Sequence, residues 1–414
     1  MNPDDVVATS EATAAPAPPV VIAPRVAARP ATHPPLLFLD GLRGLAAVFV
    51  MLHHARWLLW EGMAEGYSLH PEKYSALGRL MAYASSIFRY GHEAVIFFFV
   101  LSGFVIHLSS AKRLCAEGSA ARFDGAGYLW RRVRRLYPPL IFAMLLTFAL
   151  DRFGMALGFP IYSGQTLYPV INGAIQPDHG VVTALGNLAF LMPAWVPCWG
   201  TDGPLWSLHF EWWFYMLYPL LWLLSRRSVA LAGATVGTLF AVSLFWPNWP
   251  LPGAAAQAVP QIFTALLTWS MGALLADVVT KRTTLPLAWL AACTPLLLIV
   301  PLTRHDHGWT TSTLYGLGFT GLLALCLQLR ARGISLRWLD CLKPLGDMSY
   351  TLYITHLPIF VLLSGWLMSR TPEGTLPRHF GWMAAGALLT MVIAYAAHFL
   401  VERPFLSRAR PRVS

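Results

Sequence analysis

Ten apolar stretches in this chain are each long enough to cross a lipid bilayer, and this feature limits its possible folds more than any other. A transmembrane helix needs about 20 mostly apolar residues to span the roughly 30 Å hydrocarbon core. The sequence therefore predicts an all-α, polytopic membrane protein with about ten transmembrane helices. The stretches lie near residues 36–55, 91–110, 136–157, 205–225, 228–246, 260–279, 285–302, 311–329, 347–369 and 380–402.

The composition excludes the main alternatives. Hydrophobic residues make up 56% of the 414 residues and charged residues 12%, about half of the roughly 25% that is typical of a soluble domain. Too little polar surface would remain to cover so large an apolar volume in water, and a disordered chain needs the opposite balance. The five cysteines have neither CxxC pairs nor metal-ligand spacing, so we expect no disulfide framework and no metal site.

The distribution of basic residues predicts the orientation of the chain. A formal net charge of +10 can indicate a nucleic-acid partner. In a membrane protein, however, Lys and Arg accumulate in cytoplasmic loops. When the N-terminus is placed in the cytoplasm and the spans alternate, inside segments hold about three times as many Lys and Arg residues as outside loops. The charge therefore predicts that both termini are cytoplasmic, and it gives no support to nucleic-acid binding.

Three regions are expected along the chain. Residues 1–35 are rich in Ala and Pro and should form a disordered tail, because prolines break helices and the segment cannot build a core. Residues 36–406 should form the transmembrane domain, and residues 407–414 a basic cytoplasmic tail. A further apolar stretch at 183–193 is too short to span, so it should lie at the interface or re-enter.

The first span carries three polar residues that helical geometry places on one stripe. Its sequence is FLDGLRGLAAVFVMLHHARW, and Asp40, Arg43 and His54 align, with about 16 Å along the axis between Arg43 and His54. Asp40 and Arg43 are three residues apart and can pair. His53 points about 100° away from His54. Polar groups inside a bilayer are functional candidates by default, but an interfacial histidine and a structural Asp–Arg pair remain an open alternative.

The third span begins with the basic sequence YLWRRVRRLYPP. Arg132 and Arg135 are three residues apart and would share one face of a helix, where two guanidinium groups can clamp a phosphate. The alternative is a cluster that stops translocation and contacts anionic lipid headgroups. The spacing alone does not decide between these two roles.

The fourth span presents a polar helix face made of Ser207, Glu211, Tyr215 and Tyr218. Glu211 has no nearby partner charge in its own helix, so it must face a cavity or another helix. A structural, hydrogen-bonded glutamate is the alternative. Trp206, with neighbouring tryptophans, fits an aromatic belt at the outer interface better than a platform for a substrate.

Helix packing is the simpler interpretation of three further features, since small and hydroxyl side chains let helices approach closely. They are the Ser102-Gly103 pair in the second span, the stripe of Ser349, Tyr353 and His356 in the ninth, and His398 with Glu402 near the end of the last.

Six motifs of this chain resemble those of a known family. The resemblance covers roughly residues 36–406 and is to the integral-membrane acyltransferase 3 family, whose motifs have the same order and approximate spacing. It implies a multi-pass enzyme of the inner cell membrane. Such an enzyme moves acyl groups, commonly acetyl, from cytoplasmic acyl-CoA to hydroxyls of sugars, polysaccharides or small molecules such as macrolides. The motifs are DGLRGLAAVFVMLHH, FFFVLSGFVI, RRVRRLYPP, WSLHFEWWFY, LGDMSYTLYITH and VERPF.

The resemblance also implies roles for individual residues. The arginine and essential histidine of the family's first span match Arg43 and His54, its RxxR element matches Arg132 and Arg135, and its WSLxxE element matches Trp206, Ser207 and Glu211. Many members carry an acidic residue just before FFVLSG, where this chain has Ile96, and Glu93 lies three residues earlier. No hydrolase-like domain follows the last span, so the chain resembles the stand-alone form of the family.

These observations lead to a working assignment of the site. An imidazole is a competent base near neutral pH, so His54 would deprotonate the acceptor hydroxyl, and Glu211 would orient His54 or the acceptor. A covalent acyl-His54 intermediate is an alternative, and a proton-coupled transporter is the competing class of protein. Acyl-CoA is expected as a co-substrate, with no bound cofactor. The assignment is His54, Glu211 and Asp40 as catalytic residues, Arg43, Arg132 and Arg135 as acyl-CoA-binding residues, and Ser207, Trp206, Tyr353 and His356 as supporting residues.

Overall fold

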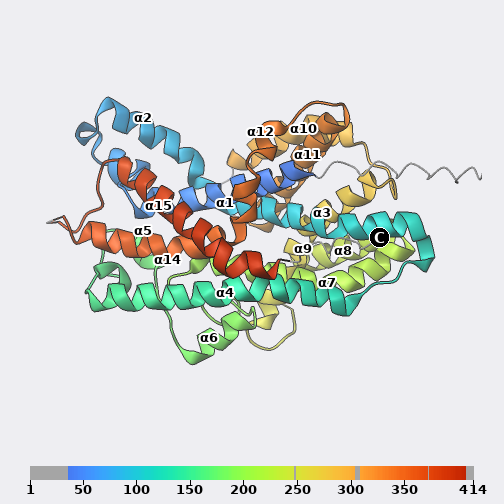
Figure 1. The fold of residues 1–414 in the computed structure, drawn as a ribbon, viewed down its shortest axis with the longest axis horizontal. Coiled ribbons are helices and arrows are strands. Elements are labelled where there is room, and N and C mark those ends of the chain that lie inside the picture. Colours follow the sequence, from blue (N-terminus) through green and yellow to red (C-terminus); the bar gives the residue numbers. More distant parts are fainter. Residues whose placement is uncertain (1–35, 247–248, 304–307, 372, 407–414) are drawn as a thin grey trace, which may run out of the picture. The chain divides into compact units, whose positions relative to one another are not determined.

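The computed structural model describes residues 36–246, 249–303, 308–371 and 373–406, and Figure 1 shows these residues as packed helices. Within these ranges there is no β-strand. The predicted all-α fold is therefore confirmed. The predicted disordered tail, residues 1–35, and the predicted basic tail, residues 407–414, lie outside the described residues.

Each of the ten predicted spans coincides with a helix. These helices are α1 (Leu37–Leu58), α3 (Gly91–Glu117), α4 (Gly125–Ala156), α7 (Trp206–Arg227), α8 (Val229–Phe245), α9 (Ala255–Val279), α10 (Leu287–Ile299), α11 (Trp309–Ala331), α14 (Ser349–Met368) and α15 (Gly381–Ala397). Shorter helices lie in the connections: α2 (Ala76–Ser85), α5 (Pro169–Ala174), α6 (Val181–Leu188), α12 (Arg337–Asp340) and α13 (Lys343–Asp347). The apolar stretch 183–193 forms only part of α6 and the turns after it.

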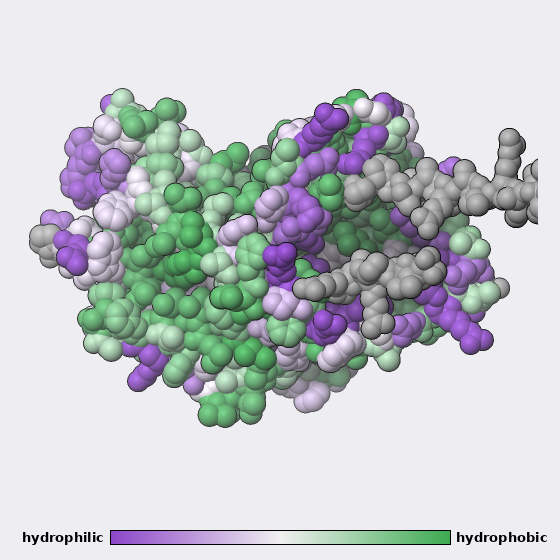
Figure 2. Space-filling view, viewed as in Figure 1, coloured by the Kyte–Doolittle hydropathy of each residue, from purple (hydrophilic) through white to green (hydrophobic). Residues whose placement is uncertain are grey.

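The helices have the length and the surface of a membrane protein. Among the described residues, seven helical segments are long and apolar enough to cross a membrane, and α8 and α10 are shorter apolar helices. Figure 2 shows a broad hydrophobic area over α4, α14 and α15. Large apolar side chains of these helices are exposed, among them Leu145 of α4 and Leu388 of α15. An exposed apolar surface of this kind is suited to lipid. The chain is thus a multi-pass membrane protein, while the count of ten spans and the cytoplasmic termini stay predictions.

Helices α3 and α9 pack closely through glycine. A Cβ atom on Gly103 would lie 1.9 Å from the carbonyl oxygen of Trp269, and one on Gly272 would lie 1.8 Å from that of Val100. Either atom would collide with backbone, so only glycine permits this distance between the helices. The Trp269 indole N–H also donates to Ser102 Oγ at 3.3 Å. The close approach predicted for the Ser102-Gly103 pair is therefore confirmed.

Three loops that the charge distribution places outside meet at one end of the helices. The Tyr168 hydroxyl donates to Glu61 Oε1 at 2.8 Å, and the backbone N–H of Leu376 donates to the Tyr168 hydroxyl at 2.8 Å. Arg378 Nε lies 2.8 Å from Glu61 Oε2. Alternation of the spans requires these loops to share a side of the membrane, and the contacts agree with that requirement.

Candidate active site

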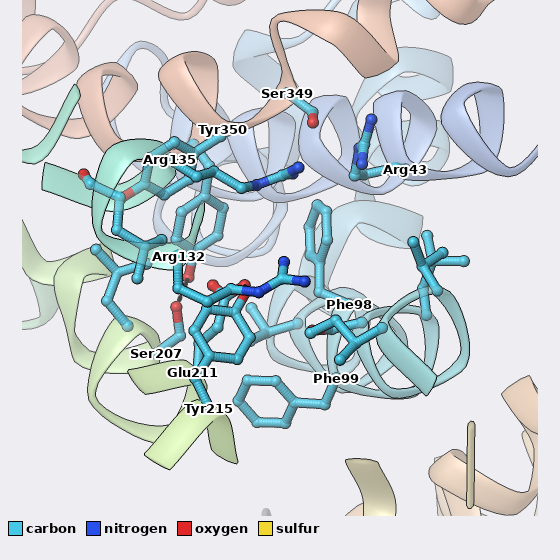
Figure 3. Close-up of a pocket in the computed structure, with 18 residues that line it drawn as sticks. Arg43, Phe98, Phe99, Arg132, Arg135, Ser207, Glu211, Tyr215, Ser349 and Tyr350 are labelled. Carbon is cyan, nitrogen blue, oxygen red and sulfur yellow. Dashed lines mark hydrogen bonds between the residues drawn. The ribbon is translucent and has the colours of Figure 1, made fainter. Parts of the chain in front are cut away.

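A cavity inside the helical bundle gathers most of the predicted site residues. It is lined by side chains from α1, α3, α4, α7 and α14 and encloses about 830 Å³ of space, part of it open to the surroundings. Figure 3 shows the side chains of Arg132 and Arg135 extending in the same direction, with Arg43 on the neighbouring helix α1. The predicted residues that line the cavity are Arg43, Arg132, Arg135, Ser207, Glu211 and Tyr353, whereas Asp40, His54, Trp206 and His356 are not part of its lining.

Arg43 is held at the cavity by two partners. Its Nη2 atom lies 2.6 Å from Asp40 Oδ1, and its Nε donates to the carbonyl of Gly346 at 3.3 Å. The pair predicted for Asp40 and Arg43 is therefore present. Asp40 acts on the cavity through Arg43, because its carboxylate fixes the direction of the guanidinium.

Arg132 and Arg135 differ from Arg43 because they form no ion pair with an acidic side chain in the described part of the chain. The Arg132 guanidinium carbon lies 5.2 Å from the ring centroid of Tyr128 and 5.1 Å from that of Tyr215. Aromatic faces stabilise a guanidinium but do not neutralise it. The cavity therefore presents two guanidinium groups, one helical turn apart on α4, that form no close ion pair within the described ranges, although the carboxylate of Glu211 lines the same cavity.

Glu211 faces the cavity, which is one of the two placements that the sequence allowed for a carboxylate without a partner charge in its own helix. The Tyr215 hydroxyl donates a short hydrogen bond to Glu211 Oε1. Ser207, one turn earlier on α7, shares a hydrogen bond of 2.8 Å with the Tyr353 hydroxyl of α14. These contacts place a hydroxyl cluster and a carboxylate along one wall of the cavity.

His54 and His356 form a second polar centre. The Nδ1 atom of His54 lies 3.0 Å from Nε2 of His356, and His356 is completely buried. The ring centroid of Tyr353, which lines the cavity, lies 6.1 Å from that of His356. The histidine pair thus lies next to Tyr353, and helix geometry separates His54 from Arg43 by about 16 Å along α1.

The two neighbouring candidates have other surroundings. His53 Nδ1 contacts the carbonyl of Phe88 at 2.9 Å. Trp206 stacks on His92, with ring centroids 5.4 Å apart and an interplanar angle of 11°. No group of three or more His, Cys, Asp or Glu side chains within the described ranges can hold a metal ion.

Several cavity residues were not among the predicted site residues. Tyr215 carried a usable signal, because it lies four residues after Glu211 on the same helix face. Phe98 and Tyr350 also line the cavity, but nothing in their local sequence separates them from the many other aromatic residues of the spans.

The fold and the cavity define the class of this protein: a multi-pass helical membrane protein with a cationic site inside its bundle. The chain belongs to the acyltransferase 3 family, since the family model described as an acyltransferase domain matches residues 36–399. It is accordingly a membrane acyltransferase, as the six motifs indicated.

Two curated proteins are similar to this chain, and the first is itself named as a transacylase. The chain is 26% identical over 382 residues to a putative membrane-bound transacylase, BcsY, of Komagataeibacter xylinus, covering 88% of this chain and 81% of that protein. It is 28% identical over 169 residues to protein 2 in the picA locus of Rhizobium radiobacter, covering 38% of this chain and 73% of that protein. No solved structure matches the chain.

Proposed function

We propose that this membrane acyltransferase takes its acyl group, acetyl in the simplest case, from cytoplasmic acyl-CoA. The acceptor is a hydroxyl of a sugar, a polysaccharide or a small molecule, and the enzyme acts in the inner cell membrane. The observation that supports the proposal is the pair of arginines, Arg132 and Arg135, that line the cavity without forming a close ion pair to a carboxylate among the described residues.

Unpaired cations inside a membrane domain are costly, so a site that keeps them is suited to an anionic ligand. Guanidinium groups match phosphate oxygens in geometry and charge. Acyl-CoA carries phosphates at one end and a thioester at the other, joined by a long, flexible pantetheine arm. With the phosphates at Arg132 and Arg135, that arm would extend past Arg43 toward His54. Arg43 and His54 are themselves about 16 Å apart along α1.

The chemical step needs a base at the far end of this route. The acceptor oxygen forms a bond to the thioester carbonyl carbon while His54 takes the hydroxyl proton. The carbon–sulfur bond then breaks, and the thiolate of CoA receives that proton from His54, so the products are an ester and free CoA. In the alternative mechanism, the acyl group is first transferred to His54 and then to the acceptor, so the same overall reaction takes place in two steps.

Glu211 lines the cavity beside the arginines, so we propose that it limits their net charge and aligns the acyl donor or the acceptor. Supporting contacts would come from Ser207 and Tyr353, whose hydroxyls share a hydrogen bond in the wall of the cavity, while the ring of Tyr353 lies next to that of His356.

The test compares donors with and without phosphates. Calorimetry on the purified protein would measure the binding of acetyl-CoA and of acetylpantetheine, which lacks the nucleotide and its phosphates. We expect acetyl-CoA to bind at least about tenfold more tightly, since charge-assisted contacts to phosphate are among the stronger hydrogen bonds. Equal affinities would contradict the proposal, because the arginines would then make no use of the phosphates.

A further inference from the structure

His54 and His356 meet although 302 positions separate them in the sequence, and three contacts surround the pair. His54 Nδ1 lies 3.0 Å from His356 Nε2 and also 3.0 Å from the carbonyl oxygen of Val50. His356 Nδ1 lies 3.0 Å from the carbonyl oxygen of Leu352. Each contact needs one proton between its two atoms, so together they restrict where the ring protons are.

The contact with Leu352 determines the tautomer of His356. A carbonyl oxygen only accepts hydrogen bonds, so the proton of a neutral His356 ring is on Nδ1. The other nitrogen, Nε2, then carries a lone pair. This lone pair points at His54, because Nε2 is the atom within 3.0 Å of His54 Nδ1.

The tautomer of His54 follows from its two contacts. Both the Val50 carbonyl and His356 Nε2 accept, so His54 carries its proton on Nδ1, shared between them. If both rings carried their protons on Nε2 instead, the lone pair of each Nδ1 would face a carbonyl oxygen, that of Val50 in α1 and that of Leu352 in α14. A doubly protonated His356 would still leave a lone pair of His54 facing Val50, and it would add a buried charge.

The remaining nitrogen of His54 is the one that can act on a substrate. Nε2 carries a lone pair in this arrangement and has no hydrogen-bond partner among the described residues. His54 is half-buried, whereas His356 is completely buried. Of the two rings, His54 is therefore the one that has a basic nitrogen without a hydrogen-bond partner in the described part of the chain and that is not fully enclosed by protein.

We propose that His356 is a positioning residue for His54. It accepts the hydrogen bond of His54 Nδ1–H, holds the ring with the Nε2 lone pair free, and stabilises the imidazolium that forms when Nε2 takes the proton of the acceptor hydroxyl. A hydrogen bond from a charged donor is stronger than one from a neutral donor, so this contact favours the protonated state. A carboxylate has this role in Ser-His-Asp triads, and here a neutral imidazole takes its place.

The catalytic part of this inference rests on the proposed function, and it gives His356 the orienting role that the sequence suggested for Glu211. The two residues lie in different places: Glu211 lines the arginine cavity, whereas His356 contacts His54 directly. His53 is not equivalent, because its Nδ1 contacts the carbonyl of Phe88.

The first test measures the tautomers without any substrate. Protein labelled with ¹⁵N-histidine in lipid bilayers would be studied by solid-state NMR, with His54→Gln and His356→Gln used to assign the signals. We expect a protonated Nδ1 and an unprotonated Nε2 in both rings, and a through-space correlation between His54 Nδ1 and His356 Nε2. A protonated Nε2 on His54 would overturn the inference. This result is independent of acyl transfer, so it stands or fails separately from the proposed function.

The second test uses kinetics. His356→Leu removes the acceptor at similar size, and His356→Gln keeps an acceptor oxygen at a similar distance from the backbone. We expect Leu to lower kcat at least about tenfold with an unchanged KM for acyl-CoA, and Gln to restore most of the loss. If the Leu variant does not fold, His356→Asn replaces it, because its shorter side chain withdraws the acceptor.

A double variant completes this test. Residues that act as a unit are not additive, so His54→Ala with His356→Leu should be no slower than His54→Ala alone. The inference is overturned if His356→Leu keeps the kcat of the wild type, if Gln is as slow as Leu, or if the two losses multiply in the double variant.

Discussion

Tyr215 donates a hydrogen bond to Glu211 one turn earlier on α7, and both side chains line the cavity that holds Arg132 and Arg135. The carboxylate is therefore fixed on the wall of the cavity and is accessible to a ligand there. Its negative charge therefore lowers the positive potential around Arg132 and Arg135, which a structural glutamate in a helix interface would not do.

Glu211→Gln separates the catalytic role from the structural one. The amide keeps the shape and most of the hydrogen-bonding capacity but removes the charge. We expect a folded protein that binds acyl-CoA and transfers the acyl group at least about tenfold more slowly. Melting temperature, acyl-CoA binding and transfer rate are measured on one preparation. Tyr215→Phe is the matched control, because it removes the partner and keeps the charge. Undiminished transfer by a stable Glu211→Gln variant would remove Glu211 from the site.

Replacing both Arg132 and Arg135 with lysine tests the phosphate site. Lysine keeps the charge but loses the bidentate fork and the contact with the rings of Tyr128 and Tyr215. We expect acyl-CoA affinity, measured by calorimetry, to fall about tenfold or more, with unchanged membrane insertion. The control is the same double change at Arg131 and Arg134, since Arg131 is an exposed residue that pairs with Asp124 at 3.6 Å. Equal effects of the two double variants would leave only a topological role for the cluster.

His54→Ala should reduce acyl transfer by at least the roughly 10² that is typical of a lost general base. His53→Ala is the matched control on the adjacent position and should cost less, because the ring of His53 contacts the backbone of Phe88. Transfer rates of both variants at saturating acyl-CoA provide the comparison. A larger loss for His53→Ala would exchange the roles of the two histidines.

Helical periodicity was sufficient to predict much of this site, because it acts within one helix. It aligned Asp40 with Arg43 and placed Glu211 on a face with Ser207 and Tyr215, and the structure shows these arrangements. The six motifs also predicted the family that residues 36–399 match. Helical periodicity could not predict contacts between helices. The meeting of His54 with His356 depends on the packing of α1 against α14, which no local pattern contains.

The short helices between the spans could not be predicted either. The apolar stretches predicted the long helices but not α2 or α13, because these short helices depend on contacts with neighbouring elements rather than on their own length or apolarity. The tryptophan-rich α7 is not among the seven segments that are long and apolar enough to cross a membrane. Its face toward the cavity carries the polar residue Glu211.

Gly103→Ala tests the packing of α3 against α9. The new methyl group would lie 1.9 Å from the carbonyl oxygen of Trp269, so the helices must move apart. Overpacking of this kind costs about 1–3 kcal/mol, and we expect a lower melting temperature in detergent. Gly237→Ala in α8 is the control, because a Cβ atom there meets nothing within 4 Å. The close contact would be contradicted if both variants melted at the temperature of the wild type.

The most direct test of the central claim is the fate of the acyl group. Purified protein in liposomes is supplied with [¹⁴C]acetyl-CoA and a panel of oligosaccharide acceptors, and both the labelled ester and the free CoA thiol are measured. The account predicts one free CoA for each labelled ester, in a reaction that His54→Ala and the Arg132/Arg135 double lysine variant strongly reduce. Uptake of a substrate into the liposomes without an ester or free CoA, as a proton-coupled transporter would give, would contradict it.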